Sequence, residues 1–330
     1  MHPDPSPGPG SDGLLMRDHQ QGVPVVVEPV EQLEHADPLV HGGGAAVLEQ
    51  RHEPRDRALV EALELSAKHL ERFARAQMAA FKDFSLELAP GLIAGQRILP
   101  VDRAAVYVPA GRFPLFSSVL MGLIPARVAG CTELVLASPP QEDGLPDPRI
   151  LAAAAIAGVD RIFTVGGAQA IAALAFGTSV VPRVDKITGP GNIHVTLAKR
   201  QVYGVVDIDM LAGPSEILII ADSTADPSFV AADLLSQAEH DEMASSVLLT
   251  PCGDLAVRVQ EEVAGQLSLL DRRDIIKRSL EHYGAIVITG DLEQAFELAG
   301  RFAPEHLEIM VDEPFHWLSR VKNAGAVFVG

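Results

Sequence analysis

Apolar positions recur with helical spacing early in the chain. Leu59, Leu63, Leu70 and Phe73 fall at steps of about three and four residues with the alanines between them, which predicts a long amphipathic helix over residues 54–83. A strand is expected at residues 25–27. Before it, residues 1–23 are rich in Pro, Gly and Ser, a composition typical of a disordered tail.

From residue 105 onward, short apolar runs alternate with helical segments. Strands are predicted at 105–108, 133–137, 161–165 and 184–187, and helices at 117–129, 147–158, 168–176 and 192–201. A second round predicts strands at 216–221, 246–250, 285–289, 307–311 and 324–329, with helices from Pro227, within 254–283, at 292–300 and at 315–321. This alternation favours an α/β fold of two doubly wound, Rossmann-like domains with parallel-rich sheets.

The 330 residues suffice for two cores of ordinary size. We expect an inserted domain at 105–213, and an outer domain built from 24–104 and 214–330. Aromatic residues are scarce (5%) while hydrophobic residues make up 48% of the chain, which suits an α/β enzyme.

The charge and the apolar runs exclude two classes of partner. A formal net charge of -18 leaves no basic stripe for a phosphate backbone, so no nucleic acid is expected. The longest apolar runs are much shorter than the ~20 residues of a membrane span, so no membrane contact is expected.

The chain has only two cysteines, Cys131 and Cys252. So few thiols argue against a disulfide framework and for a reducing compartment, here the cytoplasm. Cys131 lies near an apolar segment, and we interpret it as a small buried residue rather than a nucleophile that attacks an aldehyde.

Ligands of doubly wound sheets bind outside the carboxyl ends of the strands. Three loops there carry small or polar residues: 109–114 (PAGRFP), 166–169 with Gln169, and 189–192 (GPGN) with Asn192. Each leads into a predicted helix, whose free N–H groups suit a phosphate or another anion. No G-x-G-x-x-G fingerprint follows a strand, so the alternative that these glycines only make tight turns stays open.

A second set of candidates lies in the outer domain. Gln237 and His240 stand three residues apart on one helix face and could supply two metal ligands, although spacing alone favours a polar helix end, since two ligands do not make a zinc site. Glu305 and His306 pair a carboxylate with an imidazole just before a strand, an arrangement that can activate water and accept protons. The alternative is a turn with two exposed polar residues. Ser215 puts a hydroxyl at the head of another strand.

Together these motifs resemble the histidinol dehydrogenase family from about residue 33 to 330. The matching segments are VYVPAGRFPLFSSVLMGLIPARVAG, VGGAQAIAALAFGT, VDKITGPGNIHVTLAKRQVYG, VDIDMLAGPSE, AADLLSQAEHD and FAPEHLE. The resemblance implies NAD-dependent oxidation of L-histidinol through the aldehyde to L-histidine, the last step of histidine biosynthesis. It also implies one zinc ion per subunit, a homodimer, and a fold related to the aldehyde dehydrogenase-like superfamily.

The resemblance assigns roles by position. It implies that Glu305 and His306 form the catalytic pair and that Gln237 and His240 are zinc ligands. It implies that four residues meet the substrate, namely Ser215, Gln237, His240 and His306. It implies NAD contacts for Tyr107, Gln169 and Asn192.

Family members continue beyond residue 330 into small C-terminal domains that this chain does not include. There the family carries an aspartate and a histidine that complete the zinc site, together with a further substrate-binding glutamate. With only Gln237 and His240, the 330-residue form is expected to hold zinc weakly. Two alternatives remain: a paralogous zinc and NAD dehydrogenase of another small polar alcohol, and a non-catalytic remnant that binds nucleotide or partner subunits.

Overall fold

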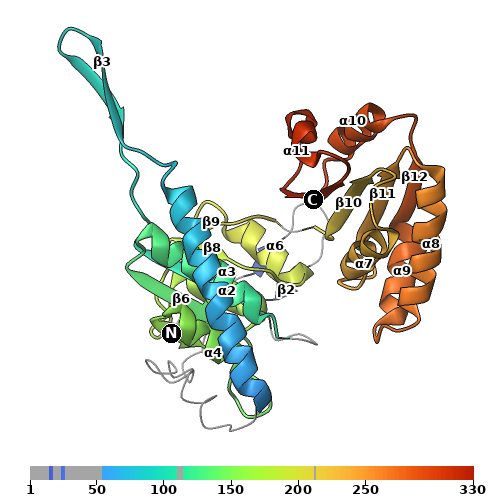
Figure 1. Cartoon of the computed structure of the whole chain (residues 1–330). Coiled ribbons are helices and arrows are strands. Elements are labelled where there is room, and N and C mark those ends of the chain that lie inside the picture. Colours follow the sequence, from blue (N-terminus) through green and yellow to red (C-terminus); the bar gives the residue numbers. More distant parts are fainter. Residues whose placement is uncertain (1–14, 18–23, 27–53, 110–113, 212) are drawn as a thin grey trace, which may run out of the picture. The chain divides into compact units, whose positions relative to one another are not determined.

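The computed structural model describes residues 15–17, 24–26, 54–109, 114–211 and 213–330. The chain divides into two compact units, Met1–Leu211 and Ala212–Gly330 (Figure 1). This boundary lies within about two residues of the predicted one between 213 and 214. Each unit contains one five-stranded parallel sheet, which confirms the predicted class of two doubly wound α/β domains.

The first unit is built on a sheet of order β7-β6-β5-β8-β9. Its strands are β5 (Arg103–Tyr107), β6 (Glu133–Ala137), β7 (Arg161–Phe163), β8 (Lys186–Thr188) and β9 (Asp207–Ile208). Helices α3 (Phe116–Ala129), α4 (Pro148–Ala157), α5 (Gly167–Phe176) and α6 (Ile193–Val202) connect them. Neighbouring strands pair in parallel throughout this sheet.

Alternation along β5 separates two hydrophobic cores. Val106 and Val108 pack into the core shared with α3 and α4. Ala105 and Tyr107 point to the other face, into the core shared with α5 and α6. Because both faces are covered, the strand is apolar at nearly every position, which is why its sequence reads as a continuous run.

Helix α2 (Pro54–Met78) belongs to the first unit. Leu63 and Ala67 join the core beside α3 and α4, and Glu71 pairs with Arg127 of α3 at 3.5 Å. The predicted outer domain grouped residues 24–104 with 214–330, whereas the compact units place α2 with the sheet of residues 103–208.

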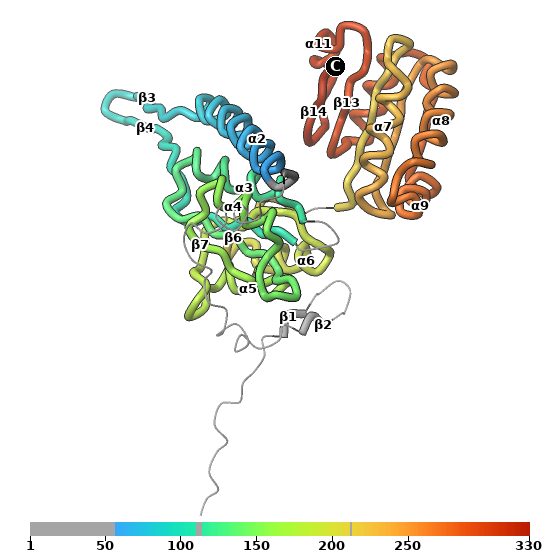
Figure 2. The backbone as a smooth tube through the Cα atoms, turned by 60° about the horizontal axis from the view of Figure 1, so that its bottom comes forward, coloured from blue at the N-terminus to red at the C-terminus, as the bar shows by residue number. Residues whose placement is uncertain are grey.

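The chain between α2 and β5 forms an antiparallel hairpin that the sequence analysis did not predict. Strands β3 (Phe84–Ala89) and β4 (Leu92–Gln96) pair with each other and project from the α/β core of the first unit (Figure 2). Every position of both strands is exposed, so burial imposes no alternation on their sequence. Helix α2 ends at Met78, before the predicted end at residue 83.

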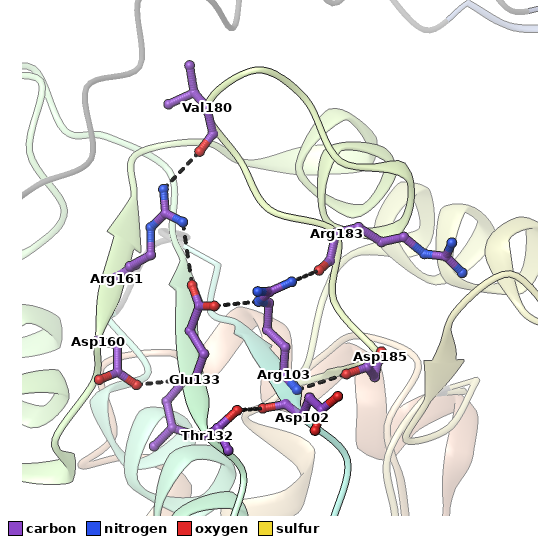
Figure 3. Close-up of polar contacts among 10 residues, drawn as sticks. Asp102, Arg103, Thr132, Glu133, Asp160, Arg161, Val180, Arg183 and Asp185 are labelled. Carbon is purple, nitrogen blue, oxygen red and sulfur yellow. Dashed lines mark hydrogen bonds and ion pairs between the residues drawn. The ribbon is translucent and has the colours of Figure 1, made fainter.

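A polar network ties together the amino ends of the strands of the first sheet (Figure 3). Arg103 Nε donates to Glu133 Oε2 at 2.5 Å, and Arg161 pairs with the other oxygen of Glu133 at 3.4 Å. Asp185 accepts from the backbone N–H of Arg103 at 2.8 Å, and Asp160 accepts from that of Leu134 at 2.7 Å. The network lies at the edge opposite the predicted ligand loops.

The second unit repeats the architecture with the strand order β12-β11-β10-β13-β14. Its strands are β10 (Glu216–Ala221), β11 (Ser245–Thr250), β12 (Gly284–Ile288), β13 (His306–Met310) and β14 (Ala326–Val329). Its helices are α7 (Pro227–Ala238), α8 (Gly253–Leu267), α9 (Arg273–Tyr283), α10 (Leu292–Phe302) and α11 (Pro314–Trp317), followed by the 3₁₀ turn η2 (Leu318–Arg320). Cores lie on both faces of the sheet, one shared with α7 and α8 and the other with α10.

Two short strands lie near the amino end of the chain. Leu15–Arg17 form β1, within the segment predicted to be a disordered tail, and pair antiparallel with β2 (Pro24–Val26). The rest of that predicted tail lies outside the described residues. Among the helices that the structure describes, none has both the length and the apolarity needed to cross a bilayer.

Candidate functional site

Tyr107 stands at the carboxyl end of β5 and reaches the loop after β7. Its ring is 2% exposed, and its hydroxyl accepts a hydrogen bond from the Gly167 N–H at 3.0 Å. Burial raises the pKa of the Tyr107 phenol, so this side chain stays neutral at physiological pH. The predicted cofactor residue is therefore a fixed, uncharged group at the edge where ligands of such sheets bind.

Gln169 lies in the first turn of α5, directly above the Tyr107 contact. Gly167 has φ +70°, and a Cβ at this residue would stand 2.8 Å from Gln169 Oε1. The amide of Gln169 therefore folds back over Gly167, so Tyr107 and Gln169 meet at one backbone residue. Gly166 caps α5 without a side-chain hydrogen bond.

Asn192 is the N-cap of α6. Its Oδ1 accepts hydrogen bonds from the N–H groups of His194 and Val195, both at 3.1 Å. The expectation of free N–H groups for an anion at this helix start is therefore wrong for those two donors. Asn192 keeps its Nδ2 group to donate to a ligand. Of the predicted loop 109–114, residues 110–113 lie outside the described residues.

Lys199 and Asp209 hold the loop that contains Asn192, and the sequence analysis did not select either of them. Lys199 Nζ donates to the Gly189 carbonyl at 3.0 Å and pairs with Asp209. Asp209 Oδ2 accepts from the Gly189 N–H at 2.7 Å. No sequence motif signals this arrangement, because Lys199 occupies an ordinary helix position two turns after Asn192.

The outer-domain candidates gather at the amino edge of the second sheet. Ser215 directly precedes β10, Glu305 directly precedes β13, and His306 begins it. Helix α7 returns from the carboxyl end of β10 to the start of β11, so Gln237 and His240 also lie at the amino edge. The carboxyl-edge rule thus describes the first unit, whereas the second unit carries its candidates at the opposite edge, in helix-to-strand segments.

Both histidines are held in one orientation by backbone carbonyls. His240 Nδ1 lies 2.9 Å from the Ser236 carbonyl oxygen, and His306 Nδ1 lies 3.1 Å from that of Glu216. Because a carbonyl oxygen only accepts, we assign the ring proton of each neutral imidazole to Nδ1. Nε2 of each ring then carries a lone pair, suited to a metal ion at His240 and to a proton at His306.

Gln237 carries a polar group without a partner. The residue is 7% exposed, and its Nε2 has no hydrogen-bond partner in the structure. A buried donor left unpaired costs free energy, so Nε2 suits an acceptor atom of a substrate, whereas a metal ion would bind the amide oxygen Oε1. Glu305 differs, since its side chain is 42% exposed and open to water, with Oε2 3.8 Å from His306 Nδ1.

The candidate metal ligands do not form a complete metal site among the residues that the structure describes. No group of three or more His, Cys, Asp or Glu side chains gathers around a common point among the residues that the structure describes. Gln237 and His240 fit a metal ion as two ligands, because His240 donates its other ring N–H to a carbonyl in the manner of metal-bound histidines. Two ligands alone do not hold a catalytic zinc firmly.

Cys131 and a pair of carboxyl groups complete the inventory of unusual side chains. Burial is the main cause that raises the pKa of the Cys131 thiol, which disfavours the thiolate needed in a nucleophile. Burial also raises the pKa of Glu308 to about 7, aided by the charge of Asp233 and a hydrogen bond with it. Glu308 follows His306 by two residues on the same face of β13, and Asp233 precedes Gln237 by one turn of α7.

Solved structures first identify the class of fold. An NAD-dependent aldehyde dehydrogenase from Sinorhizobium meliloti matches 87% of this chain and 74% of its own with a TM-score of 0.53 at 15% identity, which is evidence of a shared fold alone. Histidinol dehydrogenase from Elizabethkingia anophelis matches far better, with a TM-score of 0.83 and 37% identity over 89% of this chain and 67% of its own.

Sequence comparison then identifies the family. The model of the family described as histidinol dehydrogenase matches residues 20–330, so the chain belongs to the histidinol dehydrogenase family. The histidinol dehydrogenase of Moorella thermoacetica is 55% identical over 272 residues, which are 82% of this chain and 64% of its own. That of Aquifex aeolicus is 52% identical over 82% of this chain and 62% of its own. The chain thus spans a little under two thirds of these relatives.

Proposed function

We propose that this protein is a histidinol dehydrogenase, which oxidises L-histidinol with NAD through L-histidinal to L-histidine in histidine biosynthesis. The observation that carries the proposal is the family match over residues 20–330. The two groups of candidate residues support it, because one suits a dinucleotide and the other offers a base, a carboxylate and two metal ligands. The substrate is a small polar alcohol with an imidazole and an amine.

His306 is the proposed proton acceptor. Its Nδ1–H is held by the Glu216 carbonyl, so Nε2 faces the reaction with a lone pair. In the first oxidation Nε2 takes the hydroxyl proton of the alcohol as the carbon–hydrogen bond breaks. In the second oxidation the aldehyde must first add water, and Nε2 takes a proton from the hydrate.

Glu305 is proposed to deliver the water for that addition. Its carboxylate is exposed on one side and lies beside the ring of His306 on the other. A carboxylate in this position removes a proton from water as the oxygen attacks the aldehyde carbon, while the aldehyde oxygen takes back the proton that His306 Nε2 accepted in the first oxidation, which frees Nε2 for the second. Ser215 lies at the same edge of the sheet and is proposed to hold a polar group of the substrate.

The cofactors are proposals as well. Bound NAD would accept a hydride in each oxidation, with Tyr107, Gln169 and Asn192 as its contacts. Bound zinc would orient the imidazole and amine of the substrate and polarise the reacting oxygen. For zinc, Gln237 and His240 are the proposed ligands among residues 1–330.

A homodimer in the cytoplasm is the proposed state of the enzyme. The free thiols of Cys131 and Cys252 are consistent with a reducing compartment. The hairpin β3–β4 supports the dimer, because it exposes apolar side chains that a monomer leaves in water: Phe84, Leu86, Leu88, Leu92 and Ile93 are each at least 57% exposed.

Formation of NADH from NAD and L-histidinol with added zinc tests the proposal. We compare this chain with an extended chain, in which the C-terminal segment of the Moorella thermoacetica relative follows Gly330. Turnover by the extended chain is expected, together with little or none by the 330-residue form. If neither form oxidises histidinol while one of them oxidises another small polar alcohol, the chain is a paralogue. If neither oxidises any such alcohol, it is a non-catalytic remnant.

A further inference from the structure

An ion pair between the buried Lys199 and the more exposed Asp209 holds both backbone groups of Gly189. Lys199 is 4% exposed and donates from Nζ to the Gly189 carbonyl at 3.0 Å, and it also pairs with Asp209. Asp209 accepts from the Gly189 N–H at 2.7 Å and from the Met210 N–H at 2.7 Å. Side chains from α6 and from the end of β9 therefore fix one backbone residue between them.

The backbone of Gly189 is also restricted by its own conformation and by its contact with the end of β5. Its φ is +111°, a region that residues with a Cβ rarely adopt, and a Cβ would stand 2.1 Å from the Tyr107 carbonyl oxygen. The loop 189–192 is therefore pressed against the end of β5, and it ends at Asn192. A shift of Gly189 displaces Asn192 from Tyr107.

Lys199 carries a buried charge, which is unfavourable for folding and therefore suggests a role for its position beside the loop of the candidate cofactor site. Removing an ammonium group from water is unfavourable, and a partner offsets this only when the geometry of the pair is good. An exposed Lys–Asp pair on the neighbouring strands, Lys186 with Asp207, holds the same kind of contact without that cost and also donates to a carbonyl, that of Ile208 at 3.1 Å. The pair of Lys199 and Asp209 differs because its hydrogen bonds hold the loop of the candidate cofactor site.

We propose that Lys199 and Asp209 are positioning residues for the dinucleotide and act through Gly189. They hold the loop 189–192 at the spacing from Tyr107 and Gln169 that the cofactor requires, without touching it. This inference rests on the proposed NAD site of the first unit. It adds two residues to that site, and it predicts that cofactor affinity depends on the ion pair between Lys199 and Asp209.

The test is NADH binding to the 330-residue chain, followed by the fluorescence of NADH, because binding requires no turnover. Lys199→Met and Asp209→Asn are each expected to weaken NADH binding at least ten-fold. The matched control Lys186→Met removes an ion pair of the same type, the exposed pair between β8 and β9, and is expected to change the affinity less than two-fold. Melting temperatures of all variants are measured in parallel.

The double variant Lys199→Met/Asp209→Asn separates positioning from stability. Asp209→Asn leaves the buried ammonium group of Lys199 without a charged partner and is expected to lower the melting temperature, whereas the double variant removes both charges and regains part of it. Because residue 199 then donates no hydrogen bond to the Gly189 carbonyl, NADH binding by the double variant is expected to stay weak. An affinity that recovers together with the melting temperature would overturn the positioning role.

Two further results distinguish this inference from the proposed function. If the unaltered chain binds NADH and the variants bind it equally well, only the role of Lys199 and Asp209 is overturned. If the unaltered chain binds no NADH, the proposed cofactor site fails, and this inference fails with it. In the extended chain, the KM for NAD is expected to rise in the single variants, while the KM for histidinol stays near its original value.

Discussion

At the scale of single residues, the two histidines illustrate how backbone carbonyls prepare side chains for chemistry. His240 and His306 each give Nδ1–H to a carbonyl oxygen, which leaves Nε2 of both rings as a base or ligand. The imidazole needs no rearrangement before it accepts a proton or a metal ion. This preparation belongs to the fold, since the two carbonyls come from the end of α7 and the start of β10.

Replacing His306 by Asn in the extended chain tests this role. The amide can still donate to the Glu216 carbonyl, so the fold is expected to persist, but it has no basic nitrogen. We expect kcat for histidinol oxidation to fall by about 10²–10⁴-fold, the usual contribution of a general base, with a small change in KM. His282→Asn, in α9, is the control and is expected to leave kcat unchanged. A kcat for His306→Asn within three-fold of the parent would contradict the assignment.

Gly189 and Gly204 separate steric clash from backbone strain. Both have positive φ, but a Cβ at Gly189 would meet the Tyr107 carbonyl oxygen, whereas nothing lies within 4 Å of one at Gly204. Gly204→Ala is expected to lower the free energy of unfolding by about 1 kcal/mol through strain alone. Gly189→Ala adds the clash and is expected to cost at least about 2 kcal/mol more. Chemical denaturation measures both, and equal losses would contradict the close approach of the loop.

The sequence predicted individual chemistry only where a motif displays it. The four candidates Gln237, His240, Glu305 and His306 stand in short recognisable segments, so the roles proposed for them follow from the resemblance. Lys199 contributes through a side chain that folds back two helical turns, and its partners come from other elements. A linear pattern has no means of expressing that contact.

At the scale of elements, Asp233 and Glu308 join α7 to β13. Burial raises the pKa of both carboxyl groups. The charge of Asp233 and the hydrogen bond with it raise that of Glu308 further, to about 7, whereas the same hydrogen bond lowers that of Asp233. The pair therefore retains a proton that the unfolded chain has released at neutral pH. This contribution to stability is fully present below pH ~4.5, the ordinary pKa of Glu308, and is lost as the pH rises through about 7.

Glu308→Gln tests this linkage. The amide still donates a hydrogen bond to Asp233 but does not titrate. The free energy of unfolding of the parent chain is expected to fall relative to that of the variant by on the order of 1–2 kcal/mol between pH 5 and pH 8, allowing for solvent screening of a partly exposed pair. Urea denaturation at several pH values measures the difference. A difference that is constant over this range would show that the pair holds no extra proton.

Most elements follow from their sequence pattern, because burial on both faces of a parallel sheet leaves a strong apolar signal. Strands β6 and β10 begin and end at the predicted residues. The hairpin β3–β4 escaped prediction for the opposite reason, since its exposed strands carry no burial pattern. The sequence placed Ser215, Glu305 and His306 at strand starts. The general rule for ligand sites, however, gave the opposite edge of the sheet, so the pattern alone did not bring these candidates together with Gln237 and His240.

At the scale of the whole molecule, the hairpin β3–β4 of the first unit exposes apolar side chains to water. Leu86 is 58% exposed and Ile93 is 69% exposed, so neither stabilises the isolated fold. Leu86→Asp and Ile93→Asp in the extended chain are expected to raise the dissociation constant of the dimer at least ten-fold while leaving the melting temperature of the monomer unchanged. Sedimentation velocity measures the association, with Leu269→Asp, 84% exposed elsewhere, as the control. An extended chain that is monomeric before substitution would overturn the proposed dimer.

The proposed function makes its most specific statement about stoichiometry. Two successive oxidations in one site require two hydride transfers for each substrate consumed, with water added between them. The decisive measurement is the number of NADH molecules formed per L-histidine by the extended chain, with limiting L-histidinol and added zinc. We predict two NADH and one L-histidine for each L-histidinol. One NADH per substrate with release of the aldehyde, or consumption of histidinol without L-histidine, would contradict the account.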